Sequence, residues 1–264
     1  MNRNKPDIQT AAVIMSTYNG ERYLKEQLNS ILAQTEVSVD IYIRDDGSTD
    51  STKRILAQYE SNYKHIHVEY EKNIGVGNSF MSCLYSINDN FDYFAFCDQD
   101  DIWLPSKLIE AIHFLEKHNK QLYFSNQTCV DKKGNVIGER YDMTPKFGIL
   151  DCLTNNLVAG CTFVFSQKFK VLLVTHKPSE ELLRSRIHDV WVAEVAALEN
   201  QSIYDYRSFI LYRQHEGNVV GAYIDKSFSA RLFRKVNKLK NSVQRNGRSK
   251  LAKEIYKCFP EHQS

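Results

Sequence analysis

The sequence has no apolar stretch long enough to cross a membrane. Its longest apolar runs, such as residues 157 to 165, are far shorter than the roughly 20 residues that a transmembrane helix needs. The polar first seven residues lead into no apolar core of a signal peptide, so we do not expect export. The chain also has no internal repeat and no low-complexity linker. Repeat, membrane-spanning and secreted architectures are therefore not expected.

Cysteine is sparse, and no two cysteines form a Cys-x-x-Cys pair. The six lie at positions 83, 97, 129, 152, 161 and 258, several of them within apolar runs. This pattern favours reduced, mostly buried thiols in a cytoplasmic protein over a disulfide or zinc framework. The sequence also has no His-Glu-x-x-His motif, no Walker A loop and no Gly-x-Gly-x-x-Gly after a predicted strand. A nucleotide ligand would thus be held without a glycine-rich phosphate loop.

The composition is that of a globular protein with one unusual segment. Hydrophobic residues make up 42% of the 264 and charged residues 25%, and the 12% of aromatic residues exclude a wholly disordered chain. The net charge is +2, but residues 226 to 257 hold eleven Lys or Arg and one acid, a charge of +10. The rest of the chain then carries about −8 by subtraction. We expect an anionic partner for this basic tail only.

The first 117 residues alternate strand and helix patterns. Predicted strands over residues 11–17, 39–44, 65–70 and 93–97 alternate with predicted helices over 21–34, 50–59, 76–87 and 105–117. Such an order predicts an α/β fold with a mainly parallel central sheet and helices on both faces.

Later residues predict additions to this sheet. We expect a strand and hairpin over 122–137, a strand over 157–165, an amphipathic helix over 188–199 and a last strand over 209–213. A catalytic domain would then span residues 1–225. Residues 226–264 would form a basic amphipathic helical tail.

Polar residues gather where three predicted strands end, at 16–20, 45–50 and 98–101. Each group alone is ordinary turn or helix-capping chemistry. Ligands of open parallel sheets bind beyond the carboxyl ends of the strands, so three groups at one edge predict a binding site. Asp98 and Asp100 repel each other and need a cation. Hard divalent cations prefer oxygen ligands, which points to a nucleoside diphosphate held through a metal.

These blocks resemble a family 2 glycosyltransferase of GT-A fold, over about residues 10 to 220. The resemblance lies in Val-Ile-Met-Ser-Thr-Tyr-Asn at 13–19, Asp-Asp-Gly-Ser-Thr-Asp at 45–50 and Asp-Gln-Asp-Asp at 98–101. His-Asp-Val-Trp at 188–191 and Tyr-Arg-Gln-His at 212–215, with Asn218 and Gly221, resemble the bacterial rhamnosyltransferase-like subset that makes surface polysaccharides. The Gln-x-x-Arg-Trp motif of processive synthases is absent, which favours addition of one sugar.

The resemblance assigns a role to each of these positions. Asp189 matches the catalytic base of such inverting enzymes. Asp98, Asp100 and His215 would bind Mg²⁺ or Mn²⁺. The donor would contact Ser16, Thr17, Tyr18, Asp45, Asp46, Asn73, Asn78, Asp98, Gln99, His188, Arg213 and His215.

Several of these residues have an ordinary alternative. Asp189 would also suit a helix N-terminus, and Asp151 and Glu194 are the next candidates for the base. His188 would orient Asp189 or contact the donor phosphate, and Trp191 would be core or acceptor platform. Asn73 and Asn78 would otherwise only form a turn and a helix cap.

The donor and partners follow from the resemblance. The favoured donor is dTDP-L-rhamnose, with a UDP-hexose as the alternative and a lipid-linked saccharide as acceptor. The tail would bind an anionic membrane surface through Phe228, Leu232, Val236, Leu239 and Val243, or pack on the catalytic domain. We expect a cytoplasmic protein, peripheral at the inner face of the cell membrane, and no nucleic-acid partner. A sugar nucleotidyltransferase or an inactive sugar-nucleotide-binding module remains as another class.

Overall fold

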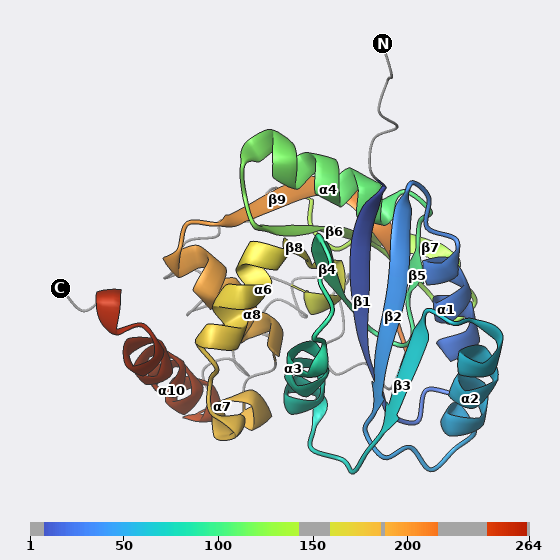
Figure 1. Ribbon diagram of the computed structural model, residues 1–264, viewed down its shortest axis with the longest axis horizontal. Helices are drawn as coiled ribbons and strands as arrows, with labels where there is room; N and C mark the ends of the chain where they lie inside the picture. The colour runs from blue at the N-terminus through green and yellow to red at the C-terminus, as the bar shows by residue number, and fades with distance from the viewer. Residues whose placement is uncertain (1–7, 143–158, 186–187, 216–241, 263–264) are drawn as a thin grey trace, which may run out of the picture.

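A mixed sheet organises the chain (Figure 1). The computed structural model describes residues 8–142, 159–185, 188–215 and 242–262, and the strands in these ranges form one nine-stranded sheet. Its order is β3-β2-β1-β4-β8-β6-β9-β5, with β7 paired to β6. The strands are β1 (Gln9–Thr17), β2 (Val37–Asp45), β3 (Ile66–Tyr70), β4 (Tyr93–Cys97), β5 (Ile102–Trp103), β6 (Leu122–Val130), β7 (Val136–Glu139), β8 (Val164–Ser166) and β9 (Ser202–Arg213).

The sheet has a parallel half and a mixed half. Strands β3, β2, β1 and β4 run parallel, as the alternating pattern predicts. The short β8 is antiparallel to both β4 and β6, and β9 runs parallel to β6. The carboxyl ends of β4, β6 and β9 therefore lie at the same edge of the sheet as those of β1 and β2.

Helices cover both faces of the sheet, as predicted (Figure 1). One face packs against α1 (Leu24–Leu32), α2 (Thr52–Asn62) and α4 (Lys107–His118). The other packs against α3 (Val76–Ser86), α6 (Gln167–Thr175), α7 (Glu180–Ser185), α8 (His188–Leu198) and the end of α10 (Ser242–Cys258). Two short 3₁₀ turns, η1 (Gly160–Thr162) and η2 (Pro260–His262), complete the described elements.

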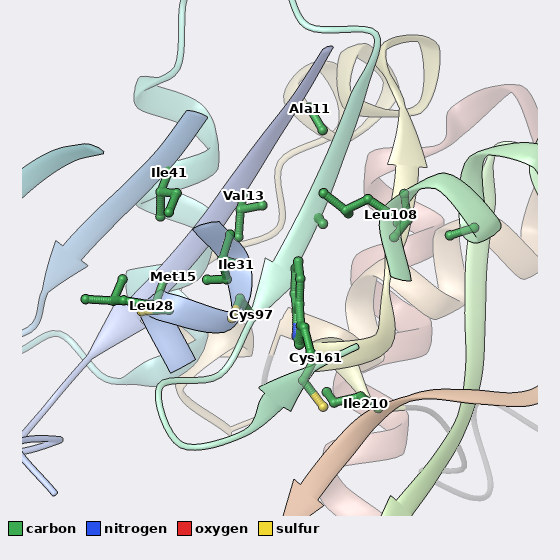
Figure 2. Packing of buried hydrophobic residues seen from close by; sticks show 14 of the residues in the cluster. Ala11, Val13, Met15, Leu28, Ile31, Ile41, Cys97, Leu108, Cys161 and Ile210 are labelled. Carbon is green, nitrogen blue, oxygen red and sulfur yellow. The ribbon is translucent and has the colours of Figure 1, made fainter. Parts of the chain in front are cut away.

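Strand β1 is buried on both sides and divides two apolar cores. Ala11, Val13 and Met15 face the first core, which Figure 2 shows with Leu28 and Ile31 of α1 around it. The alternate residues Ala12 and Ile14 face the second core. Residues that alternate along a strand point to opposite faces, so a strand covered by helices on both faces must be apolar throughout.

The predicted strand over 157–165 is wrong over most of its length. Residues 157 and 158 lie outside the described residues, Gly160–Thr162 form the turn η1, and only Val164–Ser166 pair as β8. Turn hydrogen bonds from Thr162 N to Ala159 O and from Phe163 N to Gly160 O replace strand pairing. Residues 160–163 are therefore buried as a turn beside the acidic end of β4.

The helix predicted over 188–199 exists but is not amphipathic. All nine residues from His188 to Ala196 are buried in α8, because the helix is enclosed by the second core and by Phe259, whose ring lies 6.3 Å from that of Trp191. Sequence patterns also missed β5, α6 and α7. β5 has two residues and exists only because it pairs with β9.

The described part of the basic tail packs on the rest of the protein. Leu251 and Phe259 are almost fully buried, Glu254 accepts a hydrogen bond from the Ser179 backbone N–H, and Lys250 pairs with Glu181. Figure 1 shows α10 beside α7. Phe228, Leu232, Val236 and Leu239 lie outside the described residues, as do Asp151, Cys152, Asn218 and Gly221. The other five cysteines are free. Among the helices described, none is long and apolar enough to span a membrane.

Candidate active site

The ends of β1 and β2 are joined by one buried carboxylate. Asp45 has no solvent exposure, and its carboxylate accepts hydrogen bonds from the Thr17 hydroxyl (3.0 Å), the Ser48 hydroxyl and the Ser48 backbone N–H (3.0 Å). These donors lie on both strand ends, so Asp45 sets the spacing between them. Most of its acceptor capacity is used within the protein.

Asp46 holds the loop that leads into α3. Its carboxylate pairs with buried Arg44 and accepts hydrogen bonds from the backbone N–H groups of Ile74 (2.9 Å) and Gly75 (3.0 Å). Gly75 has a φ of +86°, which an L side chain would strain. The predicted donor residue Asn73 is exposed beside this loop. The structure thus places Asp46 as the support of that loop.

Gln99 connects the end of β4 to the end of β1. Its side-chain amide accepts from the Tyr18 backbone N–H (3.0 Å) and donates to the Tyr18 carbonyl (3.1 Å). A Cβ on Gly20 would lie 2.2 Å from the Gln99 Oε1, so only glycine permits this approach. The Tyr18 ring stays 49% exposed at this edge. Such a half-exposed ring can cover the flat face of a base.

Two further predicted donor residues lie on α3 or face it. The Ser16 hydroxyl donates to the Ser79 hydroxyl at 2.7 Å. The Asn78 amide donates to the carbonyls of Ile74 (3.2 Å) and Glu180 (3.3 Å). Asn78 therefore joins α3 to α7 through its nitrogen.

An acidic cluster follows β4. One carboxylate oxygen each of Asp98 and Asp101 and the Cys161 thiol of η1 lie within 4.8 Å of one another. Burial raises the pKa of Asp98 to about 7, and Asp100 and Asp189 add to the rise. Burial also raises the pKa of Asp101, whose Oδ2 has no partner among the described residues. A bound cation would offset the repulsion between these carboxylates and stabilise their ionised form, so the cluster is suited to hold one.

The neighbouring Asp100 is linked to β9. His215 Nε2 lies 2.7 Å from its carboxylate, and the Arg213 Nε–H donates to its carbonyl at 3.1 Å. Arg213 also pairs with Glu26 at 2.6 Å, and its backbone N–H donates to Asp101. The structure thus brings three predicted residues, Asp100, Arg213 and His215, into one network.

Asp189 lies at the first turn of α8, close enough for its charge to act on Asp98. Burial raises its pKa to about 6, against the backbone hydrogen bond from Val190 and the attraction of Arg140. Beside it, the His188 ring stacks on Phe80 at 4.0 Å. Neither His188 ring nitrogen has a partner among the described residues, and burial lowers its pKa to about 3. His188 is therefore neutral and packs beside Asp189.

Arg140 is the residue that sequence patterns missed. It follows β7, donates from Nη1 to Gln127 at 2.6 Å, and its charge lowers the pKa of both Asp98 and Asp189. Gln127 in turn donates to Cys161 at 3.2 Å. A single Arg after a hairpin belongs to no motif, so only the fold could reveal it. Cys161 was missed for the same reason, whereas Asp101 stood in the Asp-Gln-Asp-Asp block but was not assigned to the metal site.

The donor set fits a hard divalent cation. Asp98 and Asp101 offer carboxylate oxygens, the ligands that Mg²⁺ and Mn²⁺ prefer, and the unpartnered Asp101 Oδ2 is fully buried. Asp100 lies two positions after Asp98 and directly before Asp101. Burial raises the pKa of the Cys161 thiol well above its usual value, so the sulfur stays a neutral thiol.

Fold and site together define a glycosyltransferase of GT-A fold. Solved structures agree on the fold: the chain superposes on TarS 1-349 of S. aureus in complex with UDP-GlcNAc with a TM-score of 0.63 at 18% identity, over 97% of this chain and 76% of that one. The mannosyltransferase PcManGT from Pyrobaculum calidifontis, in complex with GDP-Man and Mn²⁺, gives a TM-score of 0.56 at 13% identity, over 96% and 76%.

Sequence comparisons are more specific. The family model of Glycosyl transferase family 2 matches residues 12–173. The dTDP-rhamnosyl transferase RfbG of Shigella flexneri is 32% identical over 252 residues, which cover 91% of this chain and 84% of that protein. The putative teichuronic acid biosynthesis glycosyltransferase TuaG of Bacillus subtilis is 30% identical over 58% of this chain and 60% of its own length. The chain therefore belongs to glycosyl transferase family 2.

Proposed function

We propose that the protein transfers one sugar from a nucleoside-diphosphate sugar to a saccharide acceptor and inverts the anomeric carbon. The favoured donor is dTDP-L-rhamnose, because RfbG, similar over most of this chain, is a dTDP-rhamnosyl transferase. The product would enter a bacterial surface polysaccharide. The similarity to TuaG, putatively of teichuronic acid biosynthesis, supports that class of product.

The observation that carries the proposal is the buried carboxyl of Asp189 beside the acidic cluster. With a pKa of about 6, it is largely ionised at neutral pH and still basic enough to accept a proton. Asp189 takes the proton of the acceptor hydroxyl as the oxygen attacks the anomeric carbon opposite the leaving diphosphate. Such a single in-line displacement inverts that carbon.

The chain's own residues hold the donor for this step. Asp98 and the neighbouring Asp101, together with Asp100 and the His215 that contacts it, would hold Mg²⁺ or Mn²⁺. When bound, the cation would supply positive charge against the negative charge that develops on the leaving diphosphate. Arg213 holds the Asp100 loop through its bond to the Asp100 carbonyl and its pair with Glu26. The half-exposed Tyr18 would cover the nucleotide base of the donor, beside Asp45.

The acceptor would be a lipid-linked saccharide at the cytoplasmic face of a membrane. The support is the charge of +10 over residues 226–257, which would attract anionic lipids. Replacing Arg231, Arg234 and Lys235 with glutamine leaves the packed Leu251 and Phe259 in place. We expect this variant to float less with anionic liposomes than the wild type and to retain transfer to soluble acceptors. Equal flotation would exclude these charges from membrane binding.

A panel of nucleotide sugars tests the function. We expect nucleotide release from dTDP-L-rhamnose that rises when a saccharide acceptor is added, and an inverted linkage by NMR of the product. Preference for a UDP-hexose would replace the donor and keep the transferase. Pyrophosphate-dependent formation of nucleoside triphosphate would instead indicate a nucleotidyltransferase, and binding without turnover an inactive module.

A further inference from the structure

A groove of about 580 Å³ lies on the strands added to the parallel half of the sheet. It is lined by residues of β6, β7 and β9 and the segment after β7: Asn126, Thr128, Glu139, Tyr141, Asp142, Tyr204, Tyr206, Arg207 and Ser208. None of these residues belongs to the donor site described above. No role is assigned to the groove by the family motifs.

A local irregularity of the sheet opens this groove. β6 and β9 pair regularly up to Ser125 and Asp205, but the next pair is Asn126 with Ser208, so β9 has two extra residues there. These two residues, Tyr206 and Arg207, leave the ladder. Bulges of this kind re-aim side chains and often lie beside functional sites. Here the bulge leaves the Tyr206 side chain 73% exposed.

The lining has the chemistry that a sugar requires. Three tyrosines offer flat apolar rings, while an amide, hydroxyls, carboxylates and a guanidinium supply donors and acceptors. A pyranose ring has apolar C–H faces and a rim of hydroxyl groups, so it matches both parts. Sites for small ligands combine apolar rings with a few placed polar groups in the same way.

Hydrogen bonds hold the lining in place before any ligand binds. Buried Asn126 accepts from the Tyr141 backbone N–H (3.1 Å) and donates to the Tyr141 carbonyl (2.9 Å). The Ser208 hydroxyl accepts from Thr128 N at 2.8 Å, and Thr128 Oγ1 donates to Glu139 at 2.7 Å. A lining fixed in advance loses little conformational entropy on binding.

Tyr141 connects the groove to the catalytic base. It lines the groove, and the charge of Arg140, the residue before it, acts on both Asp98 and Asp189. Burial raises the pKa of the Tyr141 hydroxyl, Arg140 opposes the rise, and Asp189 adds to it. The groove and Asp189 thus lie within electrostatic reach of one side chain. Tyr141 therefore joins the lining of the groove to the electrostatic surroundings of Asp189.

We propose that this groove binds the acceptor saccharide, with Tyr206 as a stacking platform and Tyr141 at the end nearest to Asp189. The proposal rests on the proposed function, because it assigns the second substrate of the same reaction. It places the acceptor on β6, β7 and β9, while the donor lies at the ends of β1, β2 and β4.

The exposed Tyr206 permits a test without damage to the core. In wild-type enzyme, Tyr206→Ala and Tyr206→Phe, we would measure transfer from dTDP-L-rhamnose to benzyl glycosides of common hexoses and N-acetylhexosamines. Tyr206→Ala should raise the acceptor KM at least about 10-fold, while the donor KM and nucleotide release into water stay unchanged. Tyr206→Phe should restore a near-normal KM because it keeps the ring. Tyr256→Ala, a tyrosine 65% exposed on α10, is the matched control.

Saturation-transfer NMR with the same glycosides needs no turnover and separates the two proposals. Binding that Tyr206→Ala abolishes supports the groove, even if no donor in the panel is turned over and the proposed function fails. If transfer proceeds and Tyr206→Ala leaves the acceptor KM and the glycoside signals as in the wild type, the groove is not the acceptor site. Absence of glycoside binding by active wild-type enzyme would overturn it as well.

Discussion

The buried carboxylates of the β1 and β2 ends differ from those beyond β4 and on α8. Asp45 and Asp46 each accept several hydrogen bonds from backbone and side chains. Asp101 and Glu194 each keep a buried oxygen with no partner among the described residues. An unpartnered buried carboxylate costs stability, so proteins keep one mainly where chemistry needs it. The first pair holds the strand ends and the loop before α3, whereas Asp101 lies in the acidic cluster that we propose binds the cation.

The largest effect should come from the cluster beyond β4. Excess EDTA should abolish transfer, and Mg²⁺ or Mn²⁺ should restore it, because the acidic cluster would hold the cation that offsets the charge of the donor diphosphate. Asp100→Ala should lose most activity and still unfold cooperatively. Glu181→Ala, which removes an exposed carboxylate on α7, is the control. Full activity in EDTA would show that the cluster does not act through a metal.

Asp189→Asn should reduce kcat by about 10²-fold or more, because it removes the base and keeps the shape. Donor affinity should change little, and the melting temperature should not fall, since a buried charge is removed. In wild-type enzyme, kcat/KM should rise with pH through about 6 as Asp189 loses its proton. Normal turnover of the variant would place the base elsewhere.

Gly160→Ala should displace Asp189, the proposed base, without replacing any carboxylate residue. The added Cβ would lie 2.7 Å from His188 Nε2 and 3.1 Å from the Asp189 Cβ. Both neighbours are buried in the second core, so strain of about 1–3 kcal/mol should lower the free energy of unfolding. We expect kcat to fall about 10-fold and the donor KM to stay constant. An unchanged kcat would mean that α8 yields without moving Asp189.

Asp46→Asn tests the opposite region. It weakens the buried pair with Arg44 and the hold on the Ile74 and Gly75 N–H groups, so urea denaturation should show a loss of about 3 kcal/mol. The donor KM should rise, since the loop moves, while kcat falls less than in Asp189→Asn. If Asp46→Asn kept full stability and lost kcat, the contrast between the regions would be wrong.

Glu194 offers the smallest effect on activity. Burial raises its pKa from 4.5 to about 8, so the folded protein keeps a proton that the unfolded chain releases. The protonated Glu194 therefore leaves the free energy of unfolding at its full value below pH 4.5. That stability is lost as the pH rises through about 8, where the buried carboxyl ionises. At pH 9, Glu194→Gln should remove this loss of stability, which is on the order of 5 kcal/mol. Turnover should stay unchanged, which would exclude Glu194 as the base.

Sequence patterns predicted the parallel half closely and the mixed half poorly. The strands and helices up to residue 118 appear where expected, with ends that differ by a few residues, because each buries a regular apolar face. The run over 157–165 contains Gly160, which has no Cβ to clash with His188 and so permits a turn. β5, a strand of two residues, has no pattern of its own.

Local sequence thus determined the elements of the parallel half, and the family motifs at their ends predicted the donor edge. Residues within a few positions interact through period and turn chemistry, which a sequence displays. Only the tertiary structure decided that Cys161 meets Asp98, that Arg140 acts on Asp189 and that a bulge in β9 opens a groove beside Tyr141. These contacts depend on strand register and on how a buried turn and a buried helix pack. Neither feature produces a periodic pattern in the sequence.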